Sequence, residues 1–270
     1  MAIAGDYSFG IGEISFTLRN RQGDVLARRK GDTIYYAAST IKLAVAMAVI
    51  QEVEAGSLSW ERTVPSTHTF TSTRGGTFSL SDDPEEVDHD LPEDGTPISV
   101  RDLVEIMIDR SSNEATNMLV GLIGIPRVQR LCETCGMRRL HIERLIGDLA
   151  ARDHGSPNEV TTDELSSLML QATTGSWARP DNRAFLRQAL SRQHFPVIAQ
   201  TLPVGIPWGS KSGSVTGIEH DVAFIGDPDS PQLLVLAICT RGYDEQSAYE
   251  VMHAVSQALL SDRIARPGEA

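Results

Sequence analysis

The stretch STIKLAVAMAVIQEVEAG, residues 39–56, decides the fold because it predicts a helix that is apolar on most of its sides. A helix of this kind is buried in a protein core. The apolar run stops at Gly56, and glycine is typical of the residue that ends a helix. We therefore expect a buried helix that begins at Ser39.

Strand patterns lie on both sides of this helix and far from each other in the sequence. Residues 11–32 predict two strands joined by a turn at residues 19–24, with alternating apolar residues such as Ile14, Phe16 and Leu18. Between residues 101 and 170 the pattern is helical with short connections, and residues 182–193 are also predicted as helix. Strands return at residues 207–215, 220–227 and 231–242, and a last helix covers residues 245–262.

This order predicts an α/β (α+β) fold with one mostly antiparallel sheet built from both ends of the chain and flanked by helices. An all-helical domain is inserted between the two groups of strands. We place the sheet domain at residues 1–37 plus 195–270 and the inserted, mainly helical domain at residues 38–194. The junction of two such domains is a natural place for a cleft, and we expect the active site there.

The composition narrows the classes of partner. A formal net charge of −12 argues against a nucleic-acid partner, because phosphates would be repelled. No apolar run approaches the roughly 20 residues that cross a membrane. The opening residues lack a basic segment and carry Asp6, so they do not resemble a signal peptide. As given, the chain is predicted to be cytoplasmic and monomeric, and an exported protein is the alternative if the natural start differs.

Two groups of residues suggest a metal or redox site at first sight. Cys132 and Cys135 form a C-x-x-C pair, but they lie near the end of a helical pattern, and no second Cys or His pair stands at zinc spacing. Asp88, His89 and Asp90 belong to an acidic run that reads as a solvated loop. We expect structural roles for both groups, and neither a metal nor an organic cofactor is implied.

Lysine is rare in this chain, and its positions point to proton chemistry. The 24 basic residues comprise 3 lysines and 21 arginines. A lysine in a desolvated site can lose its proton and act as a base, whereas arginine cannot. Lys42 follows Ser39 by three residues, so both side chains lie on one helix face. The alternative for Ser39 is an ordinary helix N-cap.

Two further segments carry hydroxyl and amine groups. Ser111 and Asn113 follow a helical pattern and could relay a proton and orient a substrate, unless they only cap a helix. Lys211, Ser212 and Gly213 lie on a predicted strand, where they supply a charge, a hydroxyl and room for a ligand to approach the backbone. The alternative for this segment is an ordinary edge strand.

In this order and at these separations, the three segments resemble the S-x-x-K, S-x-N and K-[ST]-G motifs of class A β-lactamases and penicillin-binding proteins. The resemblance includes the domain layout and covers nearly the whole chain. It implies that Ser39 is the acylated nucleophile, that Lys42 is its general base and that Ser111 passes a proton to the leaving atom. It further implies an oxyanion hole formed by the backbone N–H groups of Ser39 and Ser214. The resemblance also implies that Asn113 binds the substrate amide. It implies that the substrate carboxylate is held by Lys211, Ser212 and Gly213.

The chain departs from this family in several places. Ser112 stands where class A enzymes carry an aspartate, and Ser212 replaces the usual threonine. Residues 1–10 are too short for the helix that usually precedes the first strand. The glutamate that clears the acyl-enzyme has no counterpart in residues 143–162, where Asp148 is the candidate carboxylate and Glu143 a weaker one. Asp148 could equally fix the loop by pairing with Arg144 or Arg152.

The sequence therefore predicts a serine hydrolase with a small-molecule substrate that carries a carboxylate and an amide or ester. A β-lactamase is the leading interpretation. A D-Ala-type carboxypeptidase, esterase or amidase of the same fold is an alternative, because fold and nucleophile do not fix the substrate. A penicillin-binding or sensor module with slow or no turnover is the alternative from another class.

Overall fold

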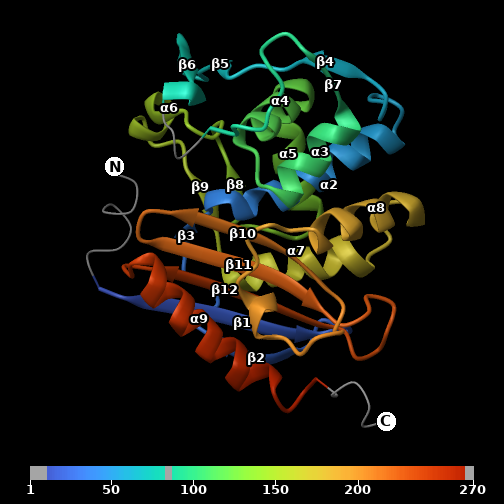
Figure 1. The fold of residues 1–270 in the computed structure, drawn as a ribbon, viewed down its shortest axis with the longest axis vertical. Coiled ribbons are helices and arrows are strands. Elements are labelled where there is room, and N and C mark those ends of the chain that lie inside the picture. The colour runs from blue at the N-terminus through green and yellow to red at the C-terminus, as the bar shows by residue number, and fades with distance from the viewer. Residues whose placement is uncertain (1–10, 83–86, 265–270) are drawn as a thin grey trace.

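The computed structural model describes residues 11–82 and 87–264, and its centre is a five-stranded antiparallel sheet in the order β10-β11-β12-β1-β2 (Figure 1). The strands are β1 (Glu13–Asn20), β2 (Val25–Arg29), β10 (Trp208–Val215), β11 (Ile218–Ile225) and β12 (Leu234–Arg241). The two ends of the chain meet where β1 pairs with β12, with Glu13 opposite Arg241. The predicted sheet, its antiparallel sense and the turn between its first two strands are confirmed.

The sheet is covered by helices on both faces, which explains the nearly continuous apolar sequence of its central strands. Along β12, Val235 and Ala237 face a core that also contains Leu168 of α7 (Thr162–Thr174). Leu236 alternates to the other face and packs with Met252 of α9 (Glu245–Leu260). Complete burial of a valine or leucine side chain stabilises the folded protein by about 1.5–3 kcal/mol.

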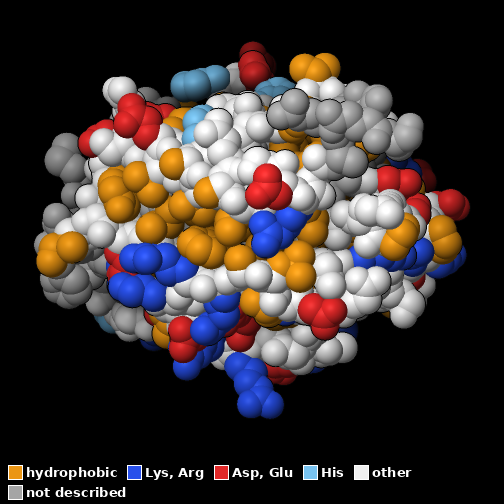
Figure 2. Space-filling model, turned by 90° about the horizontal axis from the view of Figure 1, so that it is seen from below, with side chains coloured by type: hydrophobic (Ala, Val, Ile, Leu, Met, Phe, Trp, Pro, Cys, Tyr) orange, Lys and Arg blue, Asp and Glu red, His pale blue; other side chains and the backbone are white. Residues whose placement is uncertain are grey.

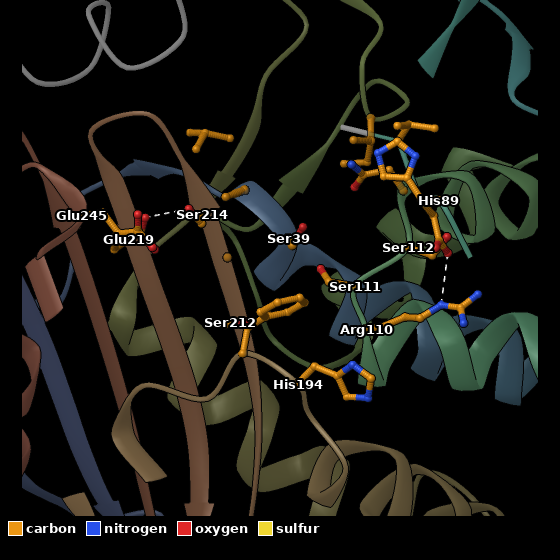
Figure 3. A pocket seen from close by; sticks show the side chains of 18 of the residues that line it. Ser39, His89, Arg110, Ser111, Ser112, His194, Ser212, Ser214, Glu219 and Glu245 are labelled. Atoms are coloured by element: carbon orange, nitrogen blue, oxygen red, sulfur yellow. Dashed lines mark hydrogen bonds and ion pairs between the residues drawn. The ribbon is translucent and has the colours of Figure 1, made fainter. Parts of the chain in front are cut away.

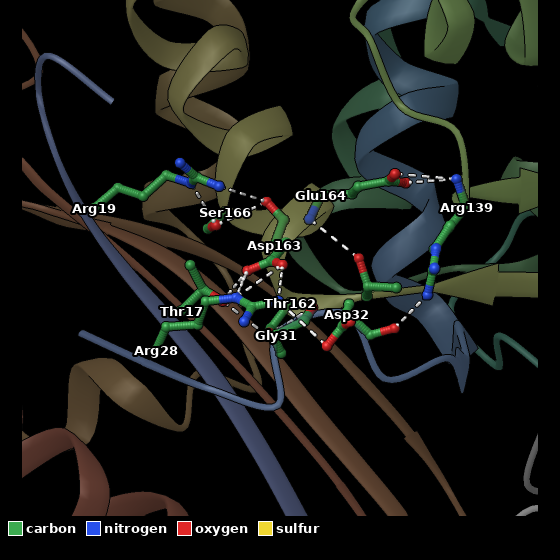
Figure 4. A network of polar contacts seen from close by, with 11 residues as sticks. Thr17, Arg19, Arg28, Gly31, Asp32, Arg139, Thr162, Asp163, Glu164 and Ser166 are labelled. Atoms are coloured by element: carbon green, nitrogen blue, oxygen red, sulfur yellow. Dashed lines mark hydrogen bonds and ion pairs between the residues drawn. The ribbon is translucent and has the colours of Figure 1, made fainter. Parts of the chain in front are cut away.

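Helix α7 is fixed to the sheet by a polar network around Asp163 (Figure 4). The Asp163 carboxylate accepts hydrogen bonds from Thr17 Oγ1 at 2.8 Å and from the Arg28 guanidinium at 2.8 Å. A Cβ atom at Gly31 would lie 2.1 Å from Asp163 Oδ1, so only glycine fits beside this carboxylate. Helix α7 thus packs on the sheet although the predicted boundaries assign it to the inserted segment, and the division at residues 38–194 stays a prediction.

The buried helix is α2 (Lys42–Glu54), and every residue from Lys42 to Ile50 is buried. It lies against helices α3, α4, α5 and α7. The helical part of the chain also contains α3 (Val100–Asp109), α4 (Asn113–Ile123), α5 (Ile125–Thr134), α6 (Leu149–Asp153) and α8 (Pro180–Ser191). The sequence prediction of a helix buried on most sides is confirmed.

The structure adds short elements that the sequence pattern does not reveal. They are the strands β3 (Tyr35–Tyr36), β4 (Thr63–Pro65), β5 (Thr69–Thr71), β6 (Thr77–Ser79), β7 (Pro97–Ser99), β8 (His141–Ile142) and β9 (Asn158–Val160), and the 3-10 turns η1 (Ala38–Ile41), η2 (Leu80–Asp82) and η3 (Ile198–Thr201). Segments of two to four residues are too short to show a period of 2 or 3.6.

The cysteine pair belongs to the core and the end of helix α5. Pro126 lies in the first turn of this helix and Gly136, with a φ of 78°, follows its end, as predicted. Cys132 is buried, and burial raises the pKa of its thiol to about 12. Cys135 is half-buried and Cys239 is fully buried, and both are free thiols. A thiol with a raised pKa is a poor nucleophile, which supports the structural role.

The surface seen from below Figure 1 gathers apolar side chains that are flanked by arginine and lysine (Figure 2). Strand β2 is an outer strand of the sheet and exposes Val25 and Leu26 together with Arg28 and Arg29. Charged residues on an edge strand discourage pairing with another sheet. None of the helices in the described ranges has the length and apolar character to cross a membrane. The prediction that residues 1–10 form no helix lies outside the described residues.

Candidate active site

The candidate nucleophile Ser39 lies in the 3-10 turn η1, directly before helix α2. Ala38 enters this turn with a φ of 45°, a conformation that is strained for a residue with a side chain. Neither η1 nor α2 has a side-chain N-cap hydrogen bond, so the hydroxyl of Ser39 does not cap the helix. The N-cap alternative for Ser39 is therefore wrong, and its hydroxyl is directed to Lys42 instead.

Lys42 brings the first two motifs together. Its side chain is completely buried, and its Nζ donates to Ser39 Oγ at 2.9 Å. The same amine lies 2.6 Å from the Ser111 carbonyl oxygen, 3.2 Å from Ser111 Oγ and 2.6 Å from Asn113 Oδ1. A hydrogen-bonded amine next to a serine hydroxyl has the geometry of a nucleophile and its base.

Ser111 connects helices α3 and α4 and adopts a φ of 63°. A left-handed backbone at a non-glycine residue costs of order 1–3 kcal/mol and is typical of functional sites. Ser112, the next residue, caps helix α4 by accepting a hydrogen bond from the backbone N–H of Ala115 at 3.3 Å. The two serines therefore have different roles. Ser112 caps helix α4, and the hydroxyl of Ser111 lies within hydrogen-bond distance of Lys42 and Lys211.

Lys211 on β10 approaches Ser111 from the other side. Its Nζ lies 3.1 Å from Ser111 Oγ and donates to the Ser212 carbonyl oxygen at 2.9 Å. Burial, and then the charge of Lys42, lower the pKa of Lys211 well below its usual value, while Asp221 and Asp109 oppose the shift. Ser111 Oγ thus lies between two buried amines, a geometry suited to moving a proton.

Gly213 lets the strand approach the nucleophile. A Cβ atom at this position would lie 2.8 Å from the Ser39 backbone nitrogen and 3.1 Å from Ala38 Cβ. The turn η1 packs on β10 at this point. Glycine is required here by the contact between two backbone segments of the protein, a reason that adds to the predicted approach of a ligand.

These groups open into a pocket of about 510 Å³ between the sheet and the helical part (Figure 3). Its lining includes Ser39, Ser111, Asn113, Ser212, Gly213 and Ser214. Lys42 and Lys211 lie beneath this surface and are completely buried. The structure therefore brings together the residues of all three motifs, as the sequence predicts.

Comparison with known proteins agrees with this geometry. The sequence matches the family described as the beta-lactamase enzyme family over residues 3–262. The chain belongs to the beta-lactamase enzyme family. No curated protein sequence matches it.

Solved structures of this fold resemble the chain over most of its length. A beta-lactamase from Sphaerobacter thermophilus is 26% identical, with a TM-score of 0.79, and the match covers 98% of this chain and 97% of the other. A beta lactamase from Xanthomonas campestris is 22% identical, with a TM-score of 0.80 and coverage of 93% and 91%. PBP-A is 20% identical, with a TM-score of 0.76 and coverage of 93% and 89%. The predicted family and fold are confirmed, and together they support a hydrolase of the serine beta-lactamase type.

Asp148, the candidate for clearing the acyl-enzyme in this beta-lactamase family member, is held in a structural arrangement. Its side chain is 1% exposed and caps helix α6 by accepting from Ala151 N at 3.0 Å. It also accepts from Ser72 Oγ at 2.9 Å and from Thr73 N at 3.2 Å. These three donors all belong to the protein, and Asp148 is not among the residues that line the pocket.

The other residues considered around Asp148 also have structural surroundings. Arg144 is buried with its guanidinium 5.4 Å from the ring centre of Tyr36, and Arg152 pairs with Asp153. Glu143 is exposed. Neither arginine pairs with Asp148 among the ion pairs of the described ranges. The partners of Asp148 are a hydroxyl and two backbone N–H groups rather than the two arginines that the loop-fixing alternative named. Whether Asp148 clears the acyl-enzyme stays a prediction.

Part of the pocket wall is formed by residues that the sequence motifs do not include. Asp88, His89 and Asp90, expected in a solvated loop, line the pocket, and Asp88 pairs with Arg110 at 3.2 Å. On the other side, Glu219, Glu245 and Tyr249 contribute to the lining, as does Phe195, which is 55% exposed. No short motif marks these residues, because the fold brings them together from four separate segments.

Proposed function

We propose that this protein is a serine hydrolase that forms an acyl-enzyme at Ser39, with β-lactam amides as the leading substrates. The hydrogen bond between Lys42 Nζ and Ser39 Oγ in a buried site carries this proposal. Membership of the beta-lactamase enzyme family supports it.

In the proposed reaction, an unprotonated Lys42 amine takes the hydroxyl proton while Ser39 Oγ attacks the acyl carbon. The backbone N–H groups of Ser39 and Ser214 would stabilise the oxyanion, a donor of this kind contributing about 3 kcal/mol in other enzymes. Ser111 Oγ, 3.2 Å from Lys42 and 3.1 Å from Lys211, would pass a proton to the leaving nitrogen as its bond to the acyl carbon breaks. Water then hydrolyses the ester at Ser39 and restores the hydroxyl.

A second candidate function is a penicillin-binding protein with a long-lived acyl-enzyme. The structural bonds of Asp148 favour it, because a carboxylate that already accepts from three protein donors is poorly placed to activate water. A variant of the structural neighbour PBP-A has been solved as an acyl-enzyme complex with penicillin G. Both candidates share acylation and differ in the rate of release.

The test is the intact mass of the protein over time after addition of penicillin G, with Ser39→Ala as the matched control. A transient adduct with accumulating product supports the β-lactamase, and a persistent adduct supports the penicillin-binding protein. In either case Ser39→Ala remains unmodified. Absence of any adduct would overturn the β-lactam proposal, and an adduct on Ser39→Ala would overturn the nucleophile.

A further inference from the structure

One end of the pocket lies beside the expected leaving atom. Ser111, the expected proton donor to that atom, is bonded to Lys211, and the expected oxyanion hole uses the backbone N–H of Ser214. The leaving part of the substrate therefore extends along β10 from Ser214 toward Lys211 and Ser212, where its carboxylate is expected. Figure 3 shows His194 close to Ser212 and Ser111 in the pocket lining. This part of the pocket, at Ser111, Ser212 and His194, is called the leaving end.

Residues 193–198 form a loop that joins the two elements carrying Ser111 and Ser212. Near its start, a backbone N–H group of the loop donates to the carbonyl oxygen of Asp109 at 2.7 Å, two residues before Ser111. At its end, two successive backbone N–H groups donate to Asp221 Oδ2, both at 2.9 Å. Asp221 lies opposite Ser212 in the sheet. The loop is therefore attached on both sides of the leaving end and lies across it.

Phe195 is the aromatic side chain that this loop presents to the pocket. It lines the pocket and is 55% exposed. Among the large apolar side chains that are exposed in residues 11–82 and 87–264, it is the one that belongs to the pocket lining. Exposed apolar side chains scattered over a surface need no explanation, but an exposed aromatic ring beside the expected leaving atom is in a position to contact a ligand.

The backbone that carries Phe195 is fixed on both sides. The N–H of Phe195 donates to Oε1 of the buried Gln193 at 3.1 Å, and Gln193 Nε2 donates to the Ile108 carbonyl oxygen at 3.0 Å. Pro196 follows and restricts the backbone of Phe195 to the extended region. The ring of His194, with its centre 6.2 Å from that of Phe195, extends the aromatic surface. A ligand that contacts a ring held in this way pays little ordering entropy.

We propose that Phe195 is a specificity-determining residue that binds an apolar ring in the leaving part of the substrate, next to the substrate carboxylate. The proposal rests on the proposed acylation of Ser39. A ring that packs on Phe195 removes apolar area of both partners from water, and the contact between two aromatic rings is favourable beyond this area. The carboxylate stays with Lys211 and Ser212, so neighbouring parts of one leaving group make the two contacts.

Two esters of phenylacetylglycine with different leaving groups test the proposal. One releases D-lactate and the other D-phenyllactate, so both leaving groups carry the same carboxylate and only the second carries a ring. In each reaction Ser39 Oγ replaces the hydroxy-acid oxygen on the acyl carbon, and that oxygen takes up a proton. Both esters give the same acyl-enzyme, so its later hydrolysis does not distinguish them.

Release of the hydroxy acid at low substrate concentration gives kcat/KM for each ester. If the acyl-enzyme persists, growth of the adduct mass gives the second-order rate constant of acylation instead. For the wild type and each variant we form the ratio of the phenyllactate-ester to the lactate-ester rate constant. Comparing this ratio between proteins cancels the intrinsic reactivities of the two esters.

We expect Phe195→Ala to lower the ratio by about tenfold, because the ring contact with the phenyllactate ester is lost. The rate constant for the lactate ester should stay close to that of the wild type. Phe195→Tyr should keep most of the wild-type ratio, since the ring remains. The matched control is Val204→Ala, which also shortens an exposed apolar side chain but lies outside the pocket lining.

The outcomes separate this inference from the function beneath it. An unchanged ratio in Phe195→Ala would overturn the ring contact and leave acylation at Ser39 intact, and this includes an equal loss of rate with both esters, which would mean that Phe195 only holds the loop. An equal drop of the ratio in Val204→Ala would also overturn it, because the effect would then not belong to the pocket. If the wild type cleaves neither ester faster than Ser39→Ala does, the inference falls together with ester hydrolysis as a function.

Discussion

A Cβ atom at Gly213 would lie 2.8 Å from the backbone nitrogen of Ser39, well inside van der Waals contact. Strand β10 and turn η1 can therefore touch backbone to backbone only because residue 213 has no side chain. The contact determines how far the nucleophile lies from Lys211 and Ser214, which belong to the same strand. A small change at Gly213 should thus act on the chemistry more than on the fold.

Gly213→Ala is expected to lower the acylation rate of Ser39 by about 100-fold, because separating η1 from β10 displaces the nucleophile from its partners. The matched control is Gly121→Ala in helix α4, where a Cβ atom would meet nothing within 4 Å. That control should be stabilising by about 0.5–1 kcal/mol, as alanine is in a helix interior. Intact-mass time courses and thermal unfolding measure both effects, and wild-type acylation in Gly213→Ala would contradict the role of this contact.

Lys42→Arg is expected to abolish acylation almost completely, because a guanidinium cannot accept the serine proton. Lys30→Arg is the matched control, since Lys30 is exposed and pairs with Glu13 on the surface. Acylation by penicillin G should be unchanged in the control. Substantial acylation of Lys42→Arg would mean that another group removes the proton from Ser39.

Much of this arrangement can be predicted from the sequence, because local patterns determine it. The alternation around Ile14 and Phe16 predicts the first strand, and the apolar run after Lys42 predicts the buried helix. The three motifs are short enough to read directly, and their residues meet as expected. Each of these features depends on residues that are close together in the sequence.

The remaining parts depend on contacts between distant segments. Asp148 has a plausible sequence position for catalysis, but its role is decided by Ser72 and Thr73, some 75 residues away. The pocket wall at Glu219 is formed by a strand pair and the start of α9, and no periodic sequence pattern predicts that these segments meet. Helix α7 has an ordinary helical sequence, and its place on the sheet follows from Asp163 binding Thr17 and Arg28.

Asp148→Asn is expected to lower the free energy of unfolding by about 1–2 kcal/mol, since the amide nitrogen cannot accept the hydrogen bond that Oδ2 receives from the backbone N–H of Thr73. The acyl-enzyme should be released at the wild-type rate, because the structure engages Asp148 in fixing the loop. Denaturant unfolding and the decay of the penicillin adduct provide the two readouts. Slower release with unchanged stability would restore Asp148 as the deacylating carboxylate.

The charge of the pocket wall should depend on pH, because Glu219 lines it. Burial, opposed by the hydrogen bond from Ser214 and reinforced by Glu245, raises the pKa of Glu219 to about 7. The titratable groups that face it from helix α9 are Glu245 and Tyr249, and burial raises the pKa of Tyr249 to about 12, so its phenol stays neutral. The Glu219 carboxyl group should therefore ionise in the folded protein as pH increases through about 7.

The same carboxyl group should cost the protein stability in alkaline solution. In the unfolded chain Glu219 ionises near its ordinary pKa of 4.5, whereas in the folded protein the pKa is about 7. Folding stability from this group is fully present below pH 4.5 and is lost as pH rises through about 7, by at most about 3 kcal/mol. Glu219→Gln carries no charge at any pH, so it should raise the melting temperature at pH 8.5, by about 2–4 °C for each kcal/mol, and leave it nearly unchanged at pH 4.5. Glu133→Gln on helix α5, at an exposed position, serves as the control. An equal shift of Glu219→Gln at both pH values would contradict the prediction, because ionisation of Glu219 would then not be the cause of the lost stability.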